Sequence, residues 1–266
     1  MEAAQVENQV RTETRHCEKH GDYEVGIVML LDKEREMGSC QKCEQEKQER
    51  QSKESEHRAR GAADAEARRI LPKRFMDCGF SDYVANDDGQ KRALAICKRY
   101  AERWSDRKEK GGCLVMCGKP GTGKTHLAAS IVREVVLREH LFRADDVSLD
   151  PRHQFALYVT ASSMSRSVKA TYSKDAQRTE HDVIREFSNK ALLVVDEVGA
   201  QRKTENELLI IQEIIDNRYQ NVLPTILISN LAESDLAEYI GERALDRMYE
   251  NGGAVVAFDW ESHRRA

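Results

Sequence analysis

The chain contains 266 residues, 40% of them hydrophobic, which is enough for about two domains with one good core. Its 42 Lys and Arg residues nearly balance its 46 Asp and Glu residues, and the net charge of -4 excludes a polycation built for duplex DNA, although not local basic patches. No apolar stretch approaches the roughly 20 residues of a membrane span, and the first residues lack the apolar core of a signal peptide. We therefore expect a cytoplasmic protein that does not enter a membrane.

Four side chains of the kinds that bind zinc lie near the N-terminus, namely Cys17, His20, Cys40 and Cys43. They form two pairs, each with two intervening residues, and two such turns can place four donors tetrahedrally around Zn²⁺. The seven cysteines of the chain are too unevenly spaced for a disulfide framework. Residues 21–30 contain glycines and β-branched side chains suited to a short hairpin, as in a zinc ribbon. Ordinary reduced cysteines are the alternative, and His16 is a competing ligand.

The stretch that follows these pairs is dense in charged side chains. Residues 44–69 consist largely of Glu, Gln, Lys and Arg, so we expect an exposed helix or helical linker that contributes to no core. Pro72 then marks the entry to the next domain. We predict a zinc-binding module at 1–45, a charged helical linker at 46–70 and a larger domain at 71–266.

Residues 118–125 read GKPGTGKT, a full match to the pattern G-x-x-x-x-G-K-T. An apolar run precedes this turn and a helical pattern follows it, which is the context of a phosphate-binding loop. Backbone N–H groups can then approach a nucleoside triphosphate, Lys124 reaches the β- and γ-phosphates, and the Thr125 hydroxyl is a ligand of Mg²⁺. We therefore predict binding of ATP or GTP. The predicted nucleotide-binding residues are Gly118, Lys119, Pro120, Gly121, Thr122, Gly123, Lys124, Thr125 and His126.

A second buried strand is predicted at residues 191–197, where a continuous apolar run ends in two carboxylates. Such a run suits a parallel sheet that is covered on both faces. Asp196 would complete the magnesium shell, and Glu197 is the candidate that orients or deprotonates the attacking water. A third buried strand at 225–229 ends at Asn230, which either senses the γ-phosphate or is simply a turn residue.

Five sequence blocks follow one another from residue 118 onward: GKPGTGKTHLA, LLVVDEVG, ISN, GERALDRM at 241–248 and FDWESHR at 258–264. Together they resemble the DnaC-type bacterial helicase loaders. The resemblance runs from about Leu71 to the C-terminus with the blocks in the family's order, and the zinc-like N-terminus resembles that of phage- and prophage-encoded relatives. It implies an AAA+ ATPase, which is an α/β P-loop fold with a parallel sheet flanked by helices.

The resemblance also assigns roles to three arginines, because AAA+ sites are shared between the subunits of a spiral. Arg247 matches the arginine finger, which reaches the γ-phosphate of a neighbouring subunit. Arg243, four residues earlier and on the same helical face, is the second candidate. Arg264 matches the sensor-2 arginine, which contacts nucleotide within its own subunit. The finger assignment requires a homo-oligomer in the ATP state.

Residues 159–172 resemble the family's strand and the helix that is specific to initiators. Arg166 and Lys169 are three residues apart, so a helix places both on one face, where they offer donors to the phosphates of single-stranded DNA. Tyr172 is a candidate to stack on a base. A solvated polar face is the alternative interpretation.

The function implied by the resemblance is that of a helicase loader. ATP-bound protein holds a DnaB-type replicative helicase and single-stranded DNA, and hydrolysis or nucleotide exchange releases the helicase onto the strand. We expect slow turnover without partners, because a switch benefits from persistence in its ATP state. The zinc-like module occupies the place of the family's helicase-binding region, so we hypothesise that it binds the helicase. Two alternatives stay open: an IstB-type transposition helper acting on duplex DNA, and a scaffold that binds nucleotide without hydrolysing it.

Overall fold

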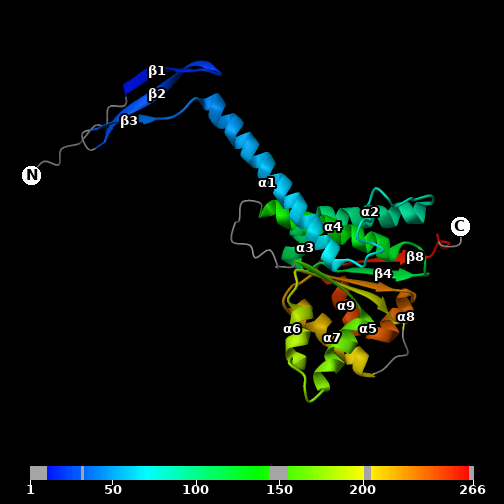
Figure 1. The fold of residues 1–266 in the computed structure, drawn as a ribbon. Coiled ribbons are helices and arrows are strands. Elements are labelled where there is room, and N and C mark those ends of the chain that lie inside the picture. Colours follow the sequence, from blue (N-terminus) through cyan, green and yellow to red (C-terminus); the bar gives the residue numbers. More distant parts are fainter. Residues whose placement is uncertain (1–10, 31–32, 144–154, 201–204, 264–266) are drawn as a thin grey trace, which may run out of the picture. The chain divides into compact units, whose positions relative to one another are not determined.

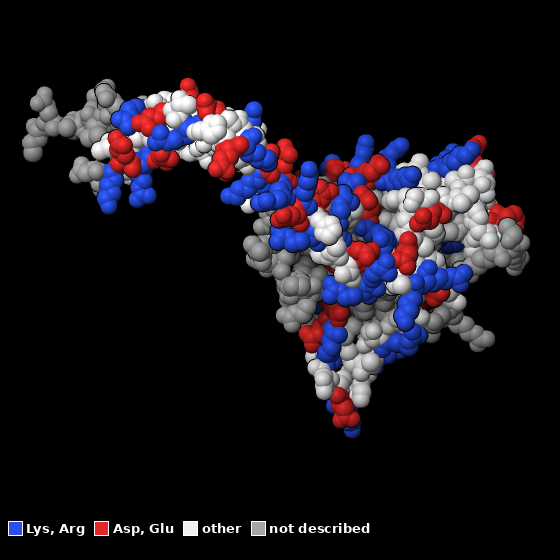
Figure 2. Space-filling view, turned by 45° about the horizontal axis from the view of Figure 1, so that its top comes forward, with Lys and Arg blue, Asp and Glu red and all other residues white. Residues whose placement is uncertain are grey.

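The computed structural model describes residues 11–30, 33–143, 155–200 and 205–263 (Figure 1). The chain divides into two compact units, Met1–Arg58 and Ala59–Ala266, and the boundary falls within helix α1 (Gln41–Ile70). No helix in these described ranges is long and apolar enough to cross a membrane. On the face drawn in Figure 2, Lys and Arg side chains are interspersed with Asp and Glu, in keeping with the near balance of charge.

The first unit contains a three-stranded antiparallel sheet in the order β1-β2-β3. Its strands are β1 (Arg11–Cys17), β2 (Gly21–Leu30) and β3 (Lys33–Met37). The expected hairpin within residues 21–30 is wrong, because these residues form one continuous strand. Val25 and Ile27 alternate along this strand and are buried, which favours an extended backbone through the whole segment. Gly21, with φ of 81°, reverses the chain between β1 and β2.

The charged stretch is helical, as expected, but its last turns carry an apolar stripe. Ala59, Ala63, Ala67 and Ile70 recur at helical spacing and are buried. The expectation that nothing in this stretch joins a core is therefore wrong for the part of α1 that belongs to the second unit. Glu66, only 1% exposed, also accepts hydrogen bonds from His140 Nε2 at 2.8 Å and from the Phe155 N–H at 2.6 Å. Alanine is small enough that its stripe is easily missed in a charged sequence.

The second unit is built on five parallel strands in the order β5-β6-β7-β4-β8. They are β4 (Leu114–Gly118), β5 (Ala156–Thr160), β6 (Leu192–Val198), β7 (Thr225–Ser229) and β8 (Ala254–Phe258). Strand β4 has apolar side chains on both faces: Leu114 and Met116 enter one core, and Val115 and Cys117 enter the other. Strand β4 lies between β7 and the edge strand β8, and the glycine loop that follows it emerges at the sheet's carboxyl edge.

Helices cover both faces of this sheet (Figure 1). Helices α2 (Asp88–Glu102) and α4 (Lys124–Phe142) lie on one face, and α5 (Ala161–Lys169) and α7 (Glu205–Gln220) lie on the other. The other helical segments are α3 (Trp104–Lys110), α6 (Glu180–Ser188), α8 (Glu233–Ile240), α9 (Glu242–Tyr249) and the 3₁₀ turns Ala170–Tyr172 and Glu250–Gly252. The α/β fold predicted from the sequence is thereby confirmed.

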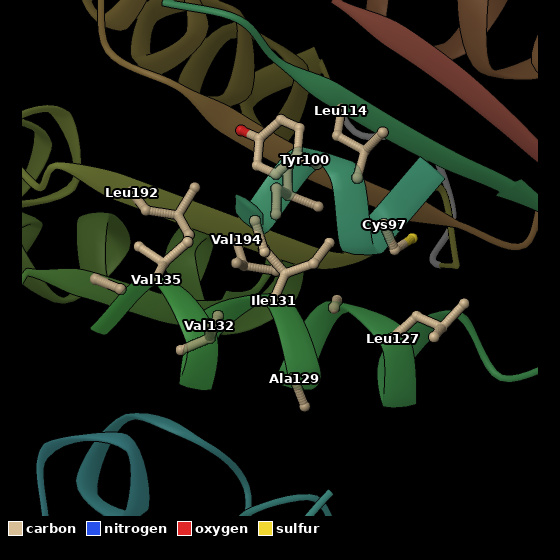
Figure 3. Packing of buried hydrophobic residues seen from close by; sticks show 14 of the residues in the cluster. Cys97, Tyr100, Leu114, Leu127, Ala129, Ile131, Val132, Val135, Leu192 and Val194 are labelled. Carbon is tan, nitrogen blue, oxygen red and sulfur yellow. The ribbon is translucent and has the colours of Figure 1, made fainter. Parts of the chain in front are cut away.

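One hydrophobic core lies between α4 and the sheet (Figure 3). Leu127, Ile131 and Val135 recur every four residues along α4 and pack in the same cluster as side chains of β4 and β6. Four cysteines lie outside the two predicted zinc-ligand pairs, and three of them are buried: Cys97, Cys113 and Cys117. Burial raises the pKa of the Cys97 thiol to about 12, which makes it unreactive. Cys78, the fourth, is half-buried.

A buried arginine links three parts of the second unit. Arg218, on α7, is 1% exposed, and its Nε donates to Thr225 Oγ1 at 2.8 Å. Its other guanidinium nitrogens donate to the backbone carbonyls of Phe187, Ser188, Lys190 and Pro224. Burial lowers its pKa to about 10, so it stays charged at neutral pH. Within the described ranges it makes no ion pair, and backbone carbonyl dipoles stabilise the charge instead.

Candidate nucleotide site and metal cluster

A cavity of about 530 Å³ lies at the carboxyl edge of the second unit's sheet. Its lining includes most of the residues that the sequence predicted for nucleotide binding and catalysis: Pro120, Gly121, Gly123, Lys124, Thr125, His126, Asp196, Glu197 and Asn230. These residues come from three separate strand ends, β4, β6 and β7, which parallel pairing brings to one edge. Further lining comes from the segment before α2, including Phe75, Cys78 and Tyr83, which the sequence had not singled out.

The glycine loop approaches its surroundings more closely than any other residue type would allow. Gly118 has φ of 120°, and a Cβ there would lie 2.4 Å from the backbone oxygen of Phe258. Gly123 has φ of 96°, and a Cβ there would lie 2.5 Å from the ring of Tyr83. Helix α4 begins at Lys124, so its first N–H groups face the cavity as an anion site does. The Lys124 ammonium donates to the carbonyls of Gly118 and Lys119, at 2.7 and 2.6 Å.

The segment after β8 donates hydrogen bonds to backbone carbonyls of the glycine loop. The indole Nε1 of Trp260 donates to the Thr122 carbonyl at 3.1 Å, and the Tyr83 hydroxyl donates to the same oxygen at 3.2 Å. The backbone N–H of His263 donates to the Gly121 carbonyl at 3.0 Å, and His263 lines the cavity. The next residue, Arg264, which the family resemblance assigned to sensor 2, lies outside the described residues. No pattern in the sequence marks Tyr83 as part of the site, because its role depends on a contact with Thr122, which is distant in the sequence.

The two carboxylates at the end of β6 differ in their surroundings. Asp196 is buried, and its Oδ2 accepts from the Thr125 hydroxyl at 3.0 Å and from the Tyr158 hydroxyl. Its Oδ1 accepts from the Glu197 N–H at 2.7 Å. Glu197 is exposed, and it has φ of 60° where the pairing of β6 with β7 shifts register between Val195 and Val198. Such a bulge re-aims a side chain, and the left-handed backbone of a non-glycine residue costs about 1–3 kcal/mol.

The predicted arginine finger lies away from this cavity. Arg247, on α9, forms an ion pair with Asp216 of α7, and its guanidinium lies 5.2 Å from the centre of the Tyr219 ring. Its side chain is only 14% exposed. Arg243 is exposed and makes no hydrogen bond or ion pair with another residue in the described part of the chain. The predicted i, i+4 pair therefore consists of one docked and one exposed arginine.

The three predicted DNA-contacting residues are all exposed, but they do not all lie on one helix. Arg166 and Lys169 lie on α5, which ends at Lys169, and Arg166 donates to Ser163 Oγ at 2.8 Å. Tyr172 lies in the 3₁₀ turn that follows, 54% exposed, and its hydroxyl donates to Glu180 at 3.1 Å. The α-helix therefore carries Arg166 and Lys169, and Tyr172 lies beyond its end.

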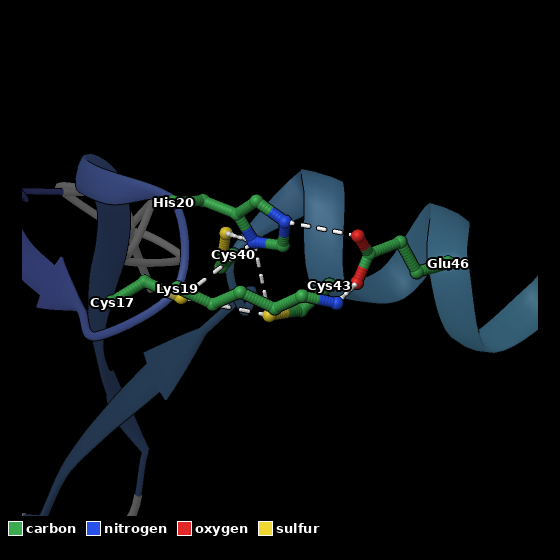
Figure 4. A network of polar contacts seen from close by, with 6 residues as sticks. All are labelled: Cys17, Lys19, His20, Cys40, Cys43 and Glu46. Atoms are coloured by element: carbon green, nitrogen blue, oxygen red, sulfur yellow. Dashed lines mark hydrogen bonds and ion pairs between the residues drawn. The ribbon is translucent and has the colours of Figure 1, made fainter.

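The four predicted zinc ligands converge in the first unit (Figure 4). Their ligand atoms, the Sγ of Cys17, Cys40 and Cys43 and one ring nitrogen of His20, all lie within 4.8 Å of one another. The His20 Nδ1 lies 3.7, 3.5 and 3.3 Å from the three sulfurs, and the sulfurs of Cys17 and Cys43 are 3.5 Å apart. Zn–S bonds of about 2.3 Å in a tetrahedron place sulfurs about 3.8 Å apart, so the set fits Zn²⁺. His16 instead pairs with Asp22 at 2.6 Å.

The surroundings of this cluster suit a metal site. Backbone N–H groups of Lys19 and His20 lower the pKa of the Cys17 thiol to about 6, which favours a thiolate there, whereas the hydrogen bond with Cys17 raises the pKa of Cys43 to about 11. The Nε2 of His20 lies 3.2 Å from a carboxylate oxygen of Glu46, which also forms an ion pair with Lys19 (Figure 4). A carboxylate behind a ligating histidine fixes the tautomer in which the opposite nitrogen binds the metal.

The parallel sheet, the glycine loop and the paired carboxylates define the class of this protein, which has a P-loop nucleotide-binding fold. The chain belongs to the family of IstB-like ATP binding proteins, whose profile matches residues 41–265. It is 31% identical to the replicative helicase loader DnaC of Escherichia coli K12 over 189 residues, which are 71% of this chain and 70% of that protein. DnaC of Buchnera aphidicola subsp. Acyrthosiphon pisum is 32% identical over 72% of this chain and 71% of its own length. The resemblance to DnaC-type loaders is thereby confirmed.

Solved structures agree on the fold. A crystal structure of the DnaC helicase loader superposes with a TM-score of 0.57 at 21% identity, covering 71% of this chain and 100% of that one. A DnaI structure gives 0.56 at 20% identity, covering 73% of this chain and 94% of that one. The replication initiator DnaA bound to AMPPCP and single-stranded DNA gives 0.54 at 18% identity, covering 72% and 51%. At these identities the likeness extends to the AAA+ fold.

Proposed function

We propose that this protein is an ATP-dependent loader that binds the replicative DNA helicase and single-stranded DNA and deposits the helicase when replication starts. Family membership supports ATP hydrolysis, and the DnaC relatives support a role in the initiation of replication. The observation that carries the proposal is the cavity in which Lys124, Asp196 and Glu197 meet, in a chain that matches about 70% of the length of those loaders.

The chemical step is phosphoryl transfer from ATP to water. Bound Mg²⁺ would neutralise phosphate charge, and Thr125 with Asp196 behind it would hold the ion. Lys124 is released from its two loop carbonyls to the β- and γ-phosphates, where the α4 N-terminus adds further N–H donors. Glu197, which lines the cavity from its bulge, would orient the attacking water, and Asn230, which lines the same cavity, would contact the γ-phosphate. We propose slow turnover that the helicase and DNA stimulate.

The arginine finger can be tested by mixing variants. Arg247→Ala is expected to lower hydrolysis about 1000-fold on the helicase, since a finger contributes that much. A mixture with Glu197→Gln should regain hydrolysis, because an intact Glu197 then meets an intact Arg247 from the neighbour. Activity is measured as phosphate release in the presence of helicase and single-stranded DNA.

Arg243→Ala serves as the comparison for this mixing experiment. Loss of hydrolysis in Arg243→Ala, with Arg247→Ala active, would assign the finger to Arg243. It would also assign the Asp216 contact of Arg247 a purely structural role. Failure of every mixture to regain activity would remove the shared-site proposal.

Zinc binding by the first unit is proposed from its donor set, three sulfurs and one imidazole nitrogen. We expect Glu46→Gln to weaken zinc affinity by about 10- to 100-fold, because the amide no longer accepts as a carboxylate from His20 Nε2. Affinity is measured by competition with a chromogenic chelator, and Glu49→Gln on the same helix is the matched control. Equal affinities for the two variants would contradict the role given to Glu46.

Helicase binding is the experiment that tests the function as a whole. The full chain is co-purified with the replicative helicase of its host in ATP, and the size of any complex is measured. We expect a complex that releases the helicase on single-stranded DNA when ATP is hydrolysed. A variant with both Cys40→Ser and Cys43→Ser is expected not to form this complex. A variant that still binds helicase would refute the zinc module's role. ATP-dependent assembly on duplex DNA without helicase would favour an IstB-type transposition helper.

A further inference from the structure

Tyr158 lies beside the catalytic carboxylates although no nucleotide motif contains it. Strands β5 and β6 run parallel, with Tyr158 opposite Val194 and Thr160 opposite Asp196. Tyr158 therefore shares a face of the sheet with Asp196, two positions further along the neighbouring strand. Its hydroxyl reaches forward and donates to Asp196 Oδ2. This contact joins the outer strand of the sheet to the carboxylate of the magnesium site.

The hydroxyl completes the set of donors around Asp196. The buried carboxylate accepts from three groups, the Tyr158 hydroxyl, the Thr125 hydroxyl at 3.0 Å and the Glu197 N–H at 2.7 Å. Because Thr125 donates its proton to Asp196, the lone pairs of its oxygen are left to face the cavity. The orientation of the Thr125 hydroxyl thus depends on the rotamer of Asp196, and the Tyr158 hydroxyl stabilises this rotamer by donating to the same oxygen, Oδ2.

The Tyr158 phenol carries a single proton, which it donates to Asp196 Oδ2. The hydroxyl has no competing partner among the hydrogen bonds of the described residues other than this carboxylate and the neighbouring Thr125. A phenylalanine would fill the same space in the core but would leave Asp196 Oδ2 with one donor fewer.

We propose that Tyr158 is a positioning residue for the magnesium–nucleotide complex: it holds Asp196 so that the Thr125 hydroxyl presents its oxygen to the ion. The inference rests on the proposed ATP-binding function of the cavity. It predicts that loss of the hydroxyl weakens binding of nucleotide together with Mg²⁺ but not binding of nucleotide alone. If Tyr158 only filled the core, loss of its hydroxyl would change both of these affinities or neither of them.

The test uses the full chain and a fluorescent ATP analogue, titrated in excess Mg²⁺ and in EDTA. Tyr158→Phe is expected to weaken affinity about tenfold with Mg²⁺, the size of effect seen for partners behind a metal ligand, and less than about twofold in EDTA. The Mg²⁺ concentration for half-maximal hydrolysis should rise while the rate at saturating Mg²⁺ is largely retained. Tyr249→Phe, whose hydroxyl donates to Glu233, is the matched control and should change neither affinity.

Asp196→Asn provides the second measurement. If Tyr158 acts through Asp196, Tyr158→Phe adds little to the Mg²⁺ effect of Asp196→Asn, whereas independent roles give additive losses. Additive losses, or equal changes with Mg²⁺ and in EDTA, would overturn the proposal. A wild-type chain that binds no analogue in either condition would instead overturn the nucleotide function on which it rests.

Discussion

Replacing Glu197 with glutamine is expected to slow ATP hydrolysis at least about 100-fold while ATP affinity changes less than about twofold. The amide keeps the size of the carboxylate but cannot accept a proton or hold a water as firmly. Glu197 is exposed at the cavity and, among the described residues, makes no hydrogen bond to the glycine loop, so we expect ATP binding to be preserved. The measurement is single-turnover hydrolysis alongside titration with a fluorescent analogue.

Glu213→Gln is the matched control, because it makes the same change at an exposed position of α7. Hydrolysis by Glu197→Gln at more than a tenth of the wild-type rate would assign the water-orienting role to another group. The variant also separates two functions. A loader driven by hydrolysis should bind helicase but fail to release it, whereas full loading by Glu197→Gln would support a scaffold that only binds nucleotide.

The largest loss of stability is expected from Arg218→Met, at about 3–5 kcal/mol in the free energy of unfolding. Replacing a buried charge with an apolar side chain is often tolerated when its partner is replaced too. Here that is impossible, because four of the acceptors are backbone carbonyls. They would remain buried without donors, and a native domain has only about 5–15 kcal/mol of stability.

Thermal unfolding and urea titration measure this loss. Arg185→Met, at an exposed position of α6, is the control and should lie within about 0.5 kcal/mol of wild type. A loss below about 1 kcal/mol for Arg218→Met would mean that water or a shift of the loops satisfies the carbonyls. In that case Arg218 would not be the link between α6, α7 and β7.

Contiguous features were predictable from the sequence because their chemistry is local. A glycine loop of this pattern between an apolar strand and a helix commonly binds phosphate. The positions of Asp196 and Glu197 follow once the apolar run before them is predicted to be a buried strand. The same holds for the two ligand pairs, whose spacing sets the reach of their side chains. For these residues the structure places together what the sequence had already grouped.

Other features depended on pairing between distant segments. Tyr158 meets Asp196 only because β5 and β6 pair in one particular register, and a shift by one residue would turn the phenol to the other face. Trp260 supports the loop from the segment after β8, and Arg218 reaches carbonyls at the end of α6 and just before β6 and β7. No local pattern marks such residues, since the same side chains would be ordinary elsewhere.

By itself, then, the sequence determined the class of protein, the phosphate loop, the two carboxylates and the four candidate metal ligands, because short-range spacing and residue chemistry are enough for these. Only the tertiary structure decided that residues 21–30 form a single strand, that the end of α1 joins the second unit's core, and that Arg247 is docked on Asp216. Each of these depends on which distant surface a segment is buried against, and burial is a property of the folded chain as a whole.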